Sequence, residues 1–205
     1  HSTGGSAALA GALLLGSRAG RFDAKGTPKA LQPFAASSVP LVTLGVFVLW
    51  LGWFGFNGGS QLALGTFTDA VAISTIFINT NLAACGGVLV AAVIPRLMTG
   101  KTDVVMMLNG AIGGLVAITA EPLAPSPLAA ILIGGVGGLI VVLGTKLLFS
   151  LKIDDVVGAI PAHLFAGIWG TLAVPITNAD ASFGAQLTGA VSYTHLTLPT
   201  KWIVG

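Results

Sequence analysis

Long apolar stretches separated by short polar breaks make up most of this chain. A helix needs about 20 mostly apolar residues to cross a lipid bilayer. Such stretches occupy residues 1–17, 39–59, 70–95, 102–120, 126–150 and 157–176, and a further helix is predicted to begin near Phe183. The stretches are too long and too closely spaced for the strands of a soluble core. The pattern therefore predicts an all-α polytopic membrane protein.

The composition agrees with this prediction. Hydrophobic residues make up 54% of the chain and charged residues only 8%, whereas a soluble domain has about 25% charged residues. The chain contains 29 glycines, and small residues let helices approach closely in lipid. A net charge of +2 predicts no nucleic-acid partner. The single cysteine, Cys85, excludes an internal disulfide.

The positions of the positive charges predict how the helices are oriented. Basic residues follow the first, third and fifth stretches, and none occurs in the intervening loops 61–69, 121–125 and 177–182. Basic loops are usually cytoplasmic. We therefore expect a multi-pass protein of the cell membrane with cytoplasmic loops at 18–38, 96–101 and 150–156. The basic residues concerned are Arg18, Arg21, Lys25, Lys29, Arg96, Lys101, Lys146 and Lys152.

An aromatic stretch, Leu49–Ser60 (LWLGWFGFNGGS), ends the second apolar stretch. Aromatic rings followed by small polar residues are typical of a membrane–water boundary, where one side of a ring is wet. Aromatic faces beside a hydroxyl can also hold a small cation, because the ring quadrupole attracts positive charge. The chemistry alone leaves both interpretations open, with the interfacial belt the more frequent.

Two histidines, His1 and His163, lie inside apolar stretches. Ionisable side chains at membrane depth are costly and usually line a cavity, a proton path or a binding site. A single buried histidine bonded to a backbone carbonyl would be the simpler explanation, but two such residues favour a function. Each is followed four residues later by a glycine, Gly5 and Gly167, and such internal echoes occur in transporters built from inverted repeats.

The remaining motifs predict structure. The chain has no glycine-rich phosphate loop, no CxxC and no HExxH motif, so we predict no enzyme, no metal site and no cofactor. Asp154–Asp155 is expected to cap a helix start. We expect Asn79 and Asn109 to form helix–helix hydrogen bonds, and Gly134, Gly135, Gly137 and Gly138 to form a tight packing surface.

Four groups of residues resemble the ammonium transporter family (Amt/Mep/Rh), in its Amt branch. They are GWFGFN at Gly52–Asn57 with Gly58-Gly59-Ser60, His1 with its small neighbours, Leu108–Ala111 with Gly114–Thr119, and Ile153–Asp155 through His163 to Gly167–Gly170. The resemblance covers residues 1 to about 190 in one register. It corresponds to the end of the family's fifth transmembrane helix through to the start of its eleventh.

The resemblance implies the ammonium-transporter fold, in which five helices are followed by five of inverted orientation and an eleventh packs across them. This chain would be a fragment holding the second five-helix repeat. Residues 1–17 would end the first repeat (helix 5), 18–38 form a cytoplasmic loop, 39–176 form the second repeat (helices 6–10), and 177–190 an outside loop with the start of helix 11.

The resemblance also implies a function and a site. His1 and His163 match the twin histidines of a hydrophobic pore, Phe56 a gating phenylalanine, Trp53 a pore-lining aromatic, and Ser60 the hydroxyl of an outer ammonium site. Ammonium would be recognised outside and deprotonated, and ammonia and the proton would pass the histidines. The implied partners are ammonium or ammonia, the lipid bilayer, two further copies in a homotrimer, and a cytoplasmic PII signalling protein.

Two departures and two alternatives accompany this reading. Gly158 stands where the family commonly has an aspartate, and Leu164 where it has a glycine, which puts the details of the cytoplasmic vestibule in question. The alternatives are an ammonium sensor that uses the same fold, and an unrelated carrier of small solutes built from inverted repeats. An appended signalling domain would favour the sensor, and unwound helices with polar groups at mid-membrane would favour the carrier.

The last residues, 191–205, break the apolar pattern, since VSYTHLTLPT holds polar residues and a proline where a membrane helix should continue. We expect this tail to be a translated sequencing-library adapter and assign no function to His195, Lys201 or Trp202. Resequencing the genomic locus tests this expectation. DNA that encodes residues 191–205 in place would show that the tail is native.

Overall fold

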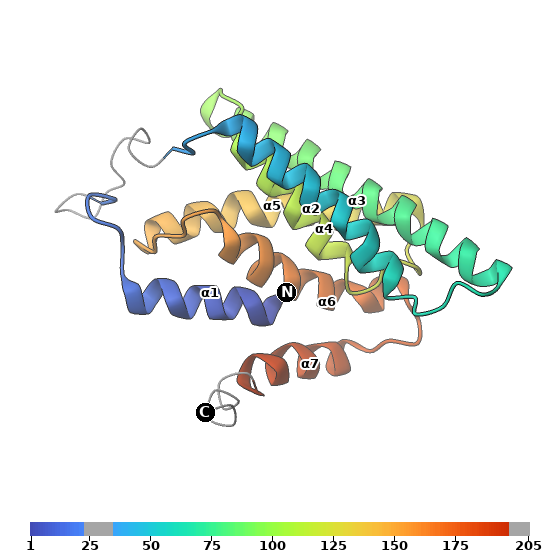
Figure 1. Ribbon diagram of the computed structural model, residues 1–205. Helices are drawn as coiled ribbons and strands as arrows, with labels where there is room; N and C mark the ends of the chain where they lie inside the picture. The colour runs from blue at the N-terminus through green and yellow to red at the C-terminus, as the bar shows by residue number, and fades with distance from the viewer. Residues whose placement is uncertain (23–34, 197–205) are drawn as a thin grey trace.

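The computed structural model describes residues 1–22 and 35–196. Every regular secondary-structure element within those ranges is a helix. They are α1 (Ser2–Leu15), α2 (Val39–Gly59), α3 (Phe67–Thr99), α4 (Val104–Ile118), α5 (Pro127–Ser150), the π-helical turn η2 (Ile160–Phe165), α6 (Ala166–Thr177) and α7 (Phe183–Leu196). Figure 1 shows α2 to α6 alternating in direction, so that loops 60–66 and 119–126 lie at one end and loops 100–103 and 151–159 at the other. The predicted all-α architecture is confirmed.

Side-chain caps fix where most of the long helices begin. The hydroxyl of Ser38 accepts a hydrogen bond from the Leu41 amide before α2, and Ser126 does the same for α5. Thr66 and Asp69 form a reciprocal capping box at the start of α3. These caps satisfy backbone amides that have no partner in the first turn. They explain why the observed starts lie within a few residues of the predicted ones.

Within residues 1–22 and 35–196, four helical segments are long and apolar enough to cross a membrane: α2, α3, α5 and the combined segment Ile160–Thr177. The predicted stretch 102–120 forms the shorter helix α4, of 15 residues, which is about 22 Å long at 1.5 Å per residue. Its residues Gly110–Ile118 are all buried. The helix therefore lies inside the bundle.

Backbone-to-backbone contact holds α3, α4 and α5 together. A Cβ atom on Gly134 would collide with the carbonyl oxygen of Ala83, and one on Gly87 with that of Gly110. A Cβ on Gly137 would lie 2.5 Å from the carbonyl oxygen of Gly113. The predicted packing surface is thus confirmed for most of its glycines. Gly135 is less crowded, because a Cβ there would lie 3.3 Å from the side chain of Val90 and 3.8 Å from the carbonyl oxygen of Gly86.

The sixth apolar stretch does not begin as an ordinary helix. Its first turn, η2, is a π-helix that contains Pro161 and His163, and such turns are rare. Asp155 caps it, because the carboxylate accepts hydrogen bonds from the amides of Gly158, Ala159 and Ile160 at 2.8–3.0 Å. The predicted cap is confirmed for this carboxylate. The sequence reading missed the π turn itself.

Asp154 has a different role from its neighbour. Its carboxylate accepts hydrogen bonds from Nε, Nη2 and the backbone amide of Arg18 at 2.7–2.9 Å, and Nε of Arg21 lies 3.4 Å away. The hydroxyl of Ser17 adds a bond to the carbonyl of Lys152. The segment after α1 is therefore fastened to the loop that leads into η2.

The side chains of Asn79 and Asn109 form hydrogen bonds to loops. Asn79 donates to the carbonyls of Pro122 and Pro125, and Asn109 donates to the carbonyl of Val157. The expected helix–helix bonds of these two residues are therefore wrong. Both side-chain amides therefore donate to backbone carbonyls of the connecting segments, and for the buried Asn79 this satisfies a donor that has no access to water.

Part of the tail is helical. α7 runs to Leu196, so the expected break at Val191 does not end the helix. A helical conformation does not decide whether residues 191–205 are native or encoded by an adapter. The end of the tail, 197–205, and residues 23–34 of the expected loop 18–38 lie outside the described residues.

The ion pair at Asp154 predicts a pH-dependent stability. The hydrogen bonds from Arg18 hold the pKa of Asp154 below its ordinary 3.8. Their stabilisation is present above that pH and is lost as the pH falls through the lower pKa of the folded state. Asp154→Asn should lower the free energy of unfolding by about 1–3 kcal/mol at neutral pH, because the charged hydrogen bonds from Arg18 are lost. The loss stays in this range because the Arg18 side chain is partly exposed to solvent. The control Asp180→Asn removes an exposed carboxylate. Equal melting temperatures for both variants in detergent would contradict the pairing.

Candidate functional site

The two histidines predicted as a pair lie in contact. Nδ1 of His1 and Nδ1 of His163 are 3.3 Å apart, and the ring centroids are separated by 5.4 Å with an interplanar angle of 29°. A hydrogen bond between two imidazole nitrogens needs a proton on one of them and a free lone pair on the other. The pair can therefore hold one proton in either of two places.

Two glycines, Gly5 and Gly167, let the two histidine-bearing segments approach closely. A Cβ on Gly5, four residues after His1, would lie 2.6 Å from Cα of Leu164. A Cβ on Gly167, four residues after His163, would lie 3.0 Å from the amide nitrogen of Ser2. Each glycine thus admits the residue that follows the opposite histidine. The echo seen in the sequence has a structural cause.

Two aromatic rings of α2 extend the row of imidazoles. His1 stacks on Trp53, with centroids 5.3 Å apart and an angle of 18°, and its centroid lies 5.6 Å from that of Phe56. Trp53 and Phe56 are themselves 6.1 Å apart. The structure therefore brings together four of the five predicted site residues.

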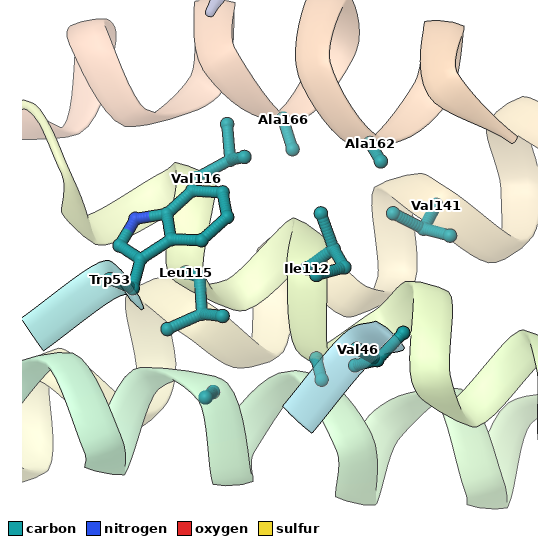
Figure 2. Close-up of a cluster of buried hydrophobic side chains, with 10 residues drawn as sticks. Val46, Trp53, Ile112, Leu115, Val116, Val141, Ala162 and Ala166 are labelled. Carbon is teal, nitrogen blue, oxygen red and sulfur yellow. The ribbon is translucent and has the colours of Figure 1, made fainter. Parts of the chain in front are cut away.

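Trp53 is held from behind by Thr119. Its indole nitrogen donates to Oγ1 of Thr119 at 2.8 Å, and that hydroxyl donates to the carbonyl of Leu115 at 2.7 Å. Figure 2 shows the indole ring among buried side chains, with Val116 of α4 and Ala166 of α6 around it. Packing and the hydrogen bond together leave the ring one orientation. Sequence reasoning missed Thr119, whose polar side chain at the end of an apolar helix was the available signal.

Ser60, the fifth predicted residue, lies at the C-terminal end of α2. Its hydroxyl donates to the carbonyl of Phe56 at 2.7 Å, so its oxygen keeps lone pairs for a donor. It lines a cavity of about 240 Å³ between α2, α3 and the turn after α4. The row of rings and this cavity share the same stretch of α2. Within the described residues, no group of His, Cys, Asp and Glu could hold a metal ion.

Gly158 explains one departure from the expected pattern. It has a positive φ of 79°, and a Cβ there would lie 2.6 Å from Nδ2 of Asn109. An aspartate here would have to adopt a left-handed backbone conformation and displace the side-chain amide of Asn109. Leu164, the other departure, is buried against Leu148 and Ile160, so apolar packing takes the place of a glycine there.

The family model described as Ammonium Transporter Family matches residues 1–202. This chain belongs to the ammonium transporter family. It is similar to ammonium transporter Amt2 of Archaeoglobus fulgidus, with 43% identity over 196 residues that cover 96% of this chain and 40% of the relative. Ammonium transporter 1 member 1 of Arabidopsis thaliana is 39% identical over 179 residues, which cover 84% of this chain and 35% of that one.

Solved structures of the family share the fold. A protein titled Sensor Amt Protein superposes with a TM-score of 0.85 at 33% identity, over 95% of this chain and 49% of that chain. Mep2 of Candida albicans superposes with a TM-score of 0.82 at 28% identity, over the whole of this chain and 47% of its own. The chain thus spans less than half of the length of these relatives. As a member of this family it is a multi-pass membrane protein, not an enzyme.

The bond between Trp53 and Thr119 can be tested by fluorescence. In a variant whose Trp50, Trp169 and Trp202 are replaced by phenylalanine, Thr119→Val should change the emission maximum of Trp53 and lower the stability by about 1–3 kcal/mol, because the buried indole loses its acceptor. Thr119→Ser keeps the hydroxyl and should preserve both properties. Identical spectra for Thr119→Val and the parent would show that the bond does not hold the ring.

Proposed function

We propose that the full-length protein that carries this segment transports ammonium across the membrane. The observation that carries the proposal is the continuous row of rings, in which Phe56, His1 and His163 follow one another at centroid separations of 5.6 and 5.4 Å. Trp53 flanks the row. The family assignment removes the unrelated solute carrier from consideration and leaves ammonium as the substrate to test.

The ring row favours ammonia over intact cations. Charge in an apolar passage is expensive. The ring of His1 contacts the aromatic rings of Trp53 and Phe56, so a pore that follows this row would oppose a cation that keeps its charge. Ammonium can shed a proton and cross as ammonia. Potassium is similar in size but has no proton to lose, and is therefore excluded by chemistry rather than by diameter.

The histidine pair offers a separate route for the released proton. Imidazole can accept a proton on one nitrogen and donate from the other. The 3.3 Å separation of the two Nδ1 atoms is suitable for transfer between rings. Ser60 and the aromatic face of Phe56 would recognise the cation before deprotonation. Phe56 would also act as the gate between this outer site and His1.

Orientation, location and assembly complete the proposal. The basic loops 18–38, 96–101 and 150–156 would face the cytoplasm of a cell whose plasma membrane holds the protein. Residues 1–17 would end a first repeat, 39–176 would form the inverted second repeat, and 177–190 would lead into the crossing helix. A homotrimer with one pore per subunit and a cytoplasmic PII regulator are the expected assembly and partner.

A sensor is the second candidate function. The observation that favours it is the TM-score of 0.85 with a protein titled Sensor Amt Protein. A sensor would bind ammonium at the same outer site and signal with little flux. The two functions differ in whether the histidine row carries substrate.

Replacing the histidines tests the proposed pathway. His1→Leu together with His163→Leu in the full-length protein should lower the ratio of ammonium to potassium transport at least about ten-fold, which corresponds to about 1.4 kcal/mol, because the proton loses its carriers. Ile168→Ala, on the exposed face of α6, is the control. Selective ammonium flux retained by the double variant in liposomes would contradict the pathway.

A further inference from the structure

The far end of α1 is joined to the loop after α5 by charged and aromatic side chains (Figure 1). The side chain of Asp154 is 2% exposed, and the guanidinium of Arg18 donates to both of its carboxylate oxygens, at 2.7 and 2.8 Å. Bidentate charged bonds of this kind are strong and directional. The guanidinium of Arg21 lies over the ring of Phe149, with Cζ 4.7 Å from the ring centroid. We refer to Arg18, Arg21, Phe149 and Asp154 as the α1 clamp.

A defined turn at the end of α5 positions Asp154 in the clamp. The amide of Lys152 donates to the carbonyl of Phe149 at 3.2 Å, and Lys152 has a left-handed φ of 60°. The amide of Ile153 donates to the carbonyl of Leu148 at 2.9 Å, and Ile153 packs against the apolar cluster that contains Leu148. These are the bonds and the contact of a Schellman helix end. They fix the direction in which the chain leaves α5, and therefore the position of the carboxylate.

Between the clamp and the histidines, α1 contacts η2 through apolar side chains. Three residues of α1 pack against the cluster of Leu148, Ile160 and Leu164: Ala8, Leu9 and Ala12. Hydrophobic attraction follows the buried area and has no preferred direction. These contacts hold α1 against η2, but they discriminate weakly between neighbouring positions along the helix axis. The directional bonds of the clamp supply that discrimination.

The contact between the histidines is sensitive to the axial position of α1. His1 precedes α1 and Arg18 follows it, so a displacement at one end of this 14-residue helix is carried to the other. In the other segment, Asp154 is adjacent to Asp155, which caps the π turn that contains His163. The two Nδ1 atoms are 3.3 Å apart. An increase of about 0.3 Å in this separation would break the hydrogen bond.

We propose that the α1 clamp sets the axial position of α1 against η2 and thereby the separation of the two imidazoles. Arg18 and Asp154 are then positioning residues, which act on the histidines through α1 and the capped turn. Their effect on the contact between the rings does not depend on what the protein transports. Their effect on ammonium flux rests on the proposed transport function.

Nitrogen NMR of the full-length protein with isotope-labelled histidine tests the clamp. A hydrogen bond between two nitrogens produces a scalar coupling between them, which the parent protein should show for the two Nδ1 atoms and a His163→Leu variant should lack. Arg18→Gln removes the bidentate bonds and should abolish the coupling. Lys152→Gln is the matched control, because it removes a neighbouring positive charge while the bonds described for Lys152 are made by its backbone. It should retain the coupling.

Transport provides a second readout. Arg18→Gln should lower the maximal ammonium flux about ten-fold or more, because a small misplacement of reacting groups is costly. The half-saturating ammonium concentration should stay within about two-fold of the parent, because the proposed outer site lies away from the clamp. Ser126→Ala removes a helix cap at the opposite end of the bundle and controls for lost stability. It should leave the maximal flux per folded protein unchanged.

The outcomes separate the clamp from transport. No coupling in the parent, coupling retained in Arg18→Gln, or coupling lost equally in Lys152→Gln would overturn the clamp. Coupling lost only in Arg18→Gln, in a protein whose parent shows no ammonium flux in liposomes, would support the clamp and contradict transport. If Arg18→Gln does not fold, Arg18→Lys decides: it keeps the charge but not the bidentate geometry, and retention of the coupling would overturn the proposal.

Discussion

The site depends on one physical constraint, the reciprocal close approach of the two histidine-bearing segments. Gly5 admits the backbone of Leu164, and Gly167 admits the backbone of Ser2. Because each glycine lies four residues after a histidine, the contact that lets the segments touch also brings the imidazoles within hydrogen-bond distance. A side chain at Gly5 would have to separate the helices, and with them His1 and His163, whereas a Cβ at Gly167, 3.0 Å from the amide nitrogen of Ser2, would require a smaller shift.

The rest of the bundle holds the two histidine-bearing segments in contact. Glycine contacts bring α3, α4 and α5 backbone to backbone. Thr119, which directly follows α4, accepts the hydrogen bond from the indole nitrogen of Trp53. At the opposite end of α1, Arg18 binds Asp154, next to the carboxylate that caps the π turn of His163. The two histidine segments are therefore tied near the rings and again at their far ends.

Much of the fold could be predicted from the sequence, because membrane helices need long apolar runs and their caps and basic loops mark the ends. α2 was predicted at Val39–Gly59, where the structure has it. The π turn at His163 could not be predicted, since an apolar run does not distinguish a π turn from an ordinary helical turn. The resemblance singled out His1, His163, Trp53 and Phe56. The role of Thr119 could not be predicted, because it depends on the position of the Trp53 ring in the folded bundle.

The measurement that tests the account most directly is the current on a rapid ammonium pulse, recorded from liposomes that contain the full-length protein. Deprotonation outside, with ammonia and the proton passing His1 and His163 separately, moves net charge. The account therefore predicts a saturable current with ammonium and none with an equal pulse of potassium. Equal currents with both cations would contradict selection by deprotonation, and ammonia uptake without any current would contradict the proton route through the histidines.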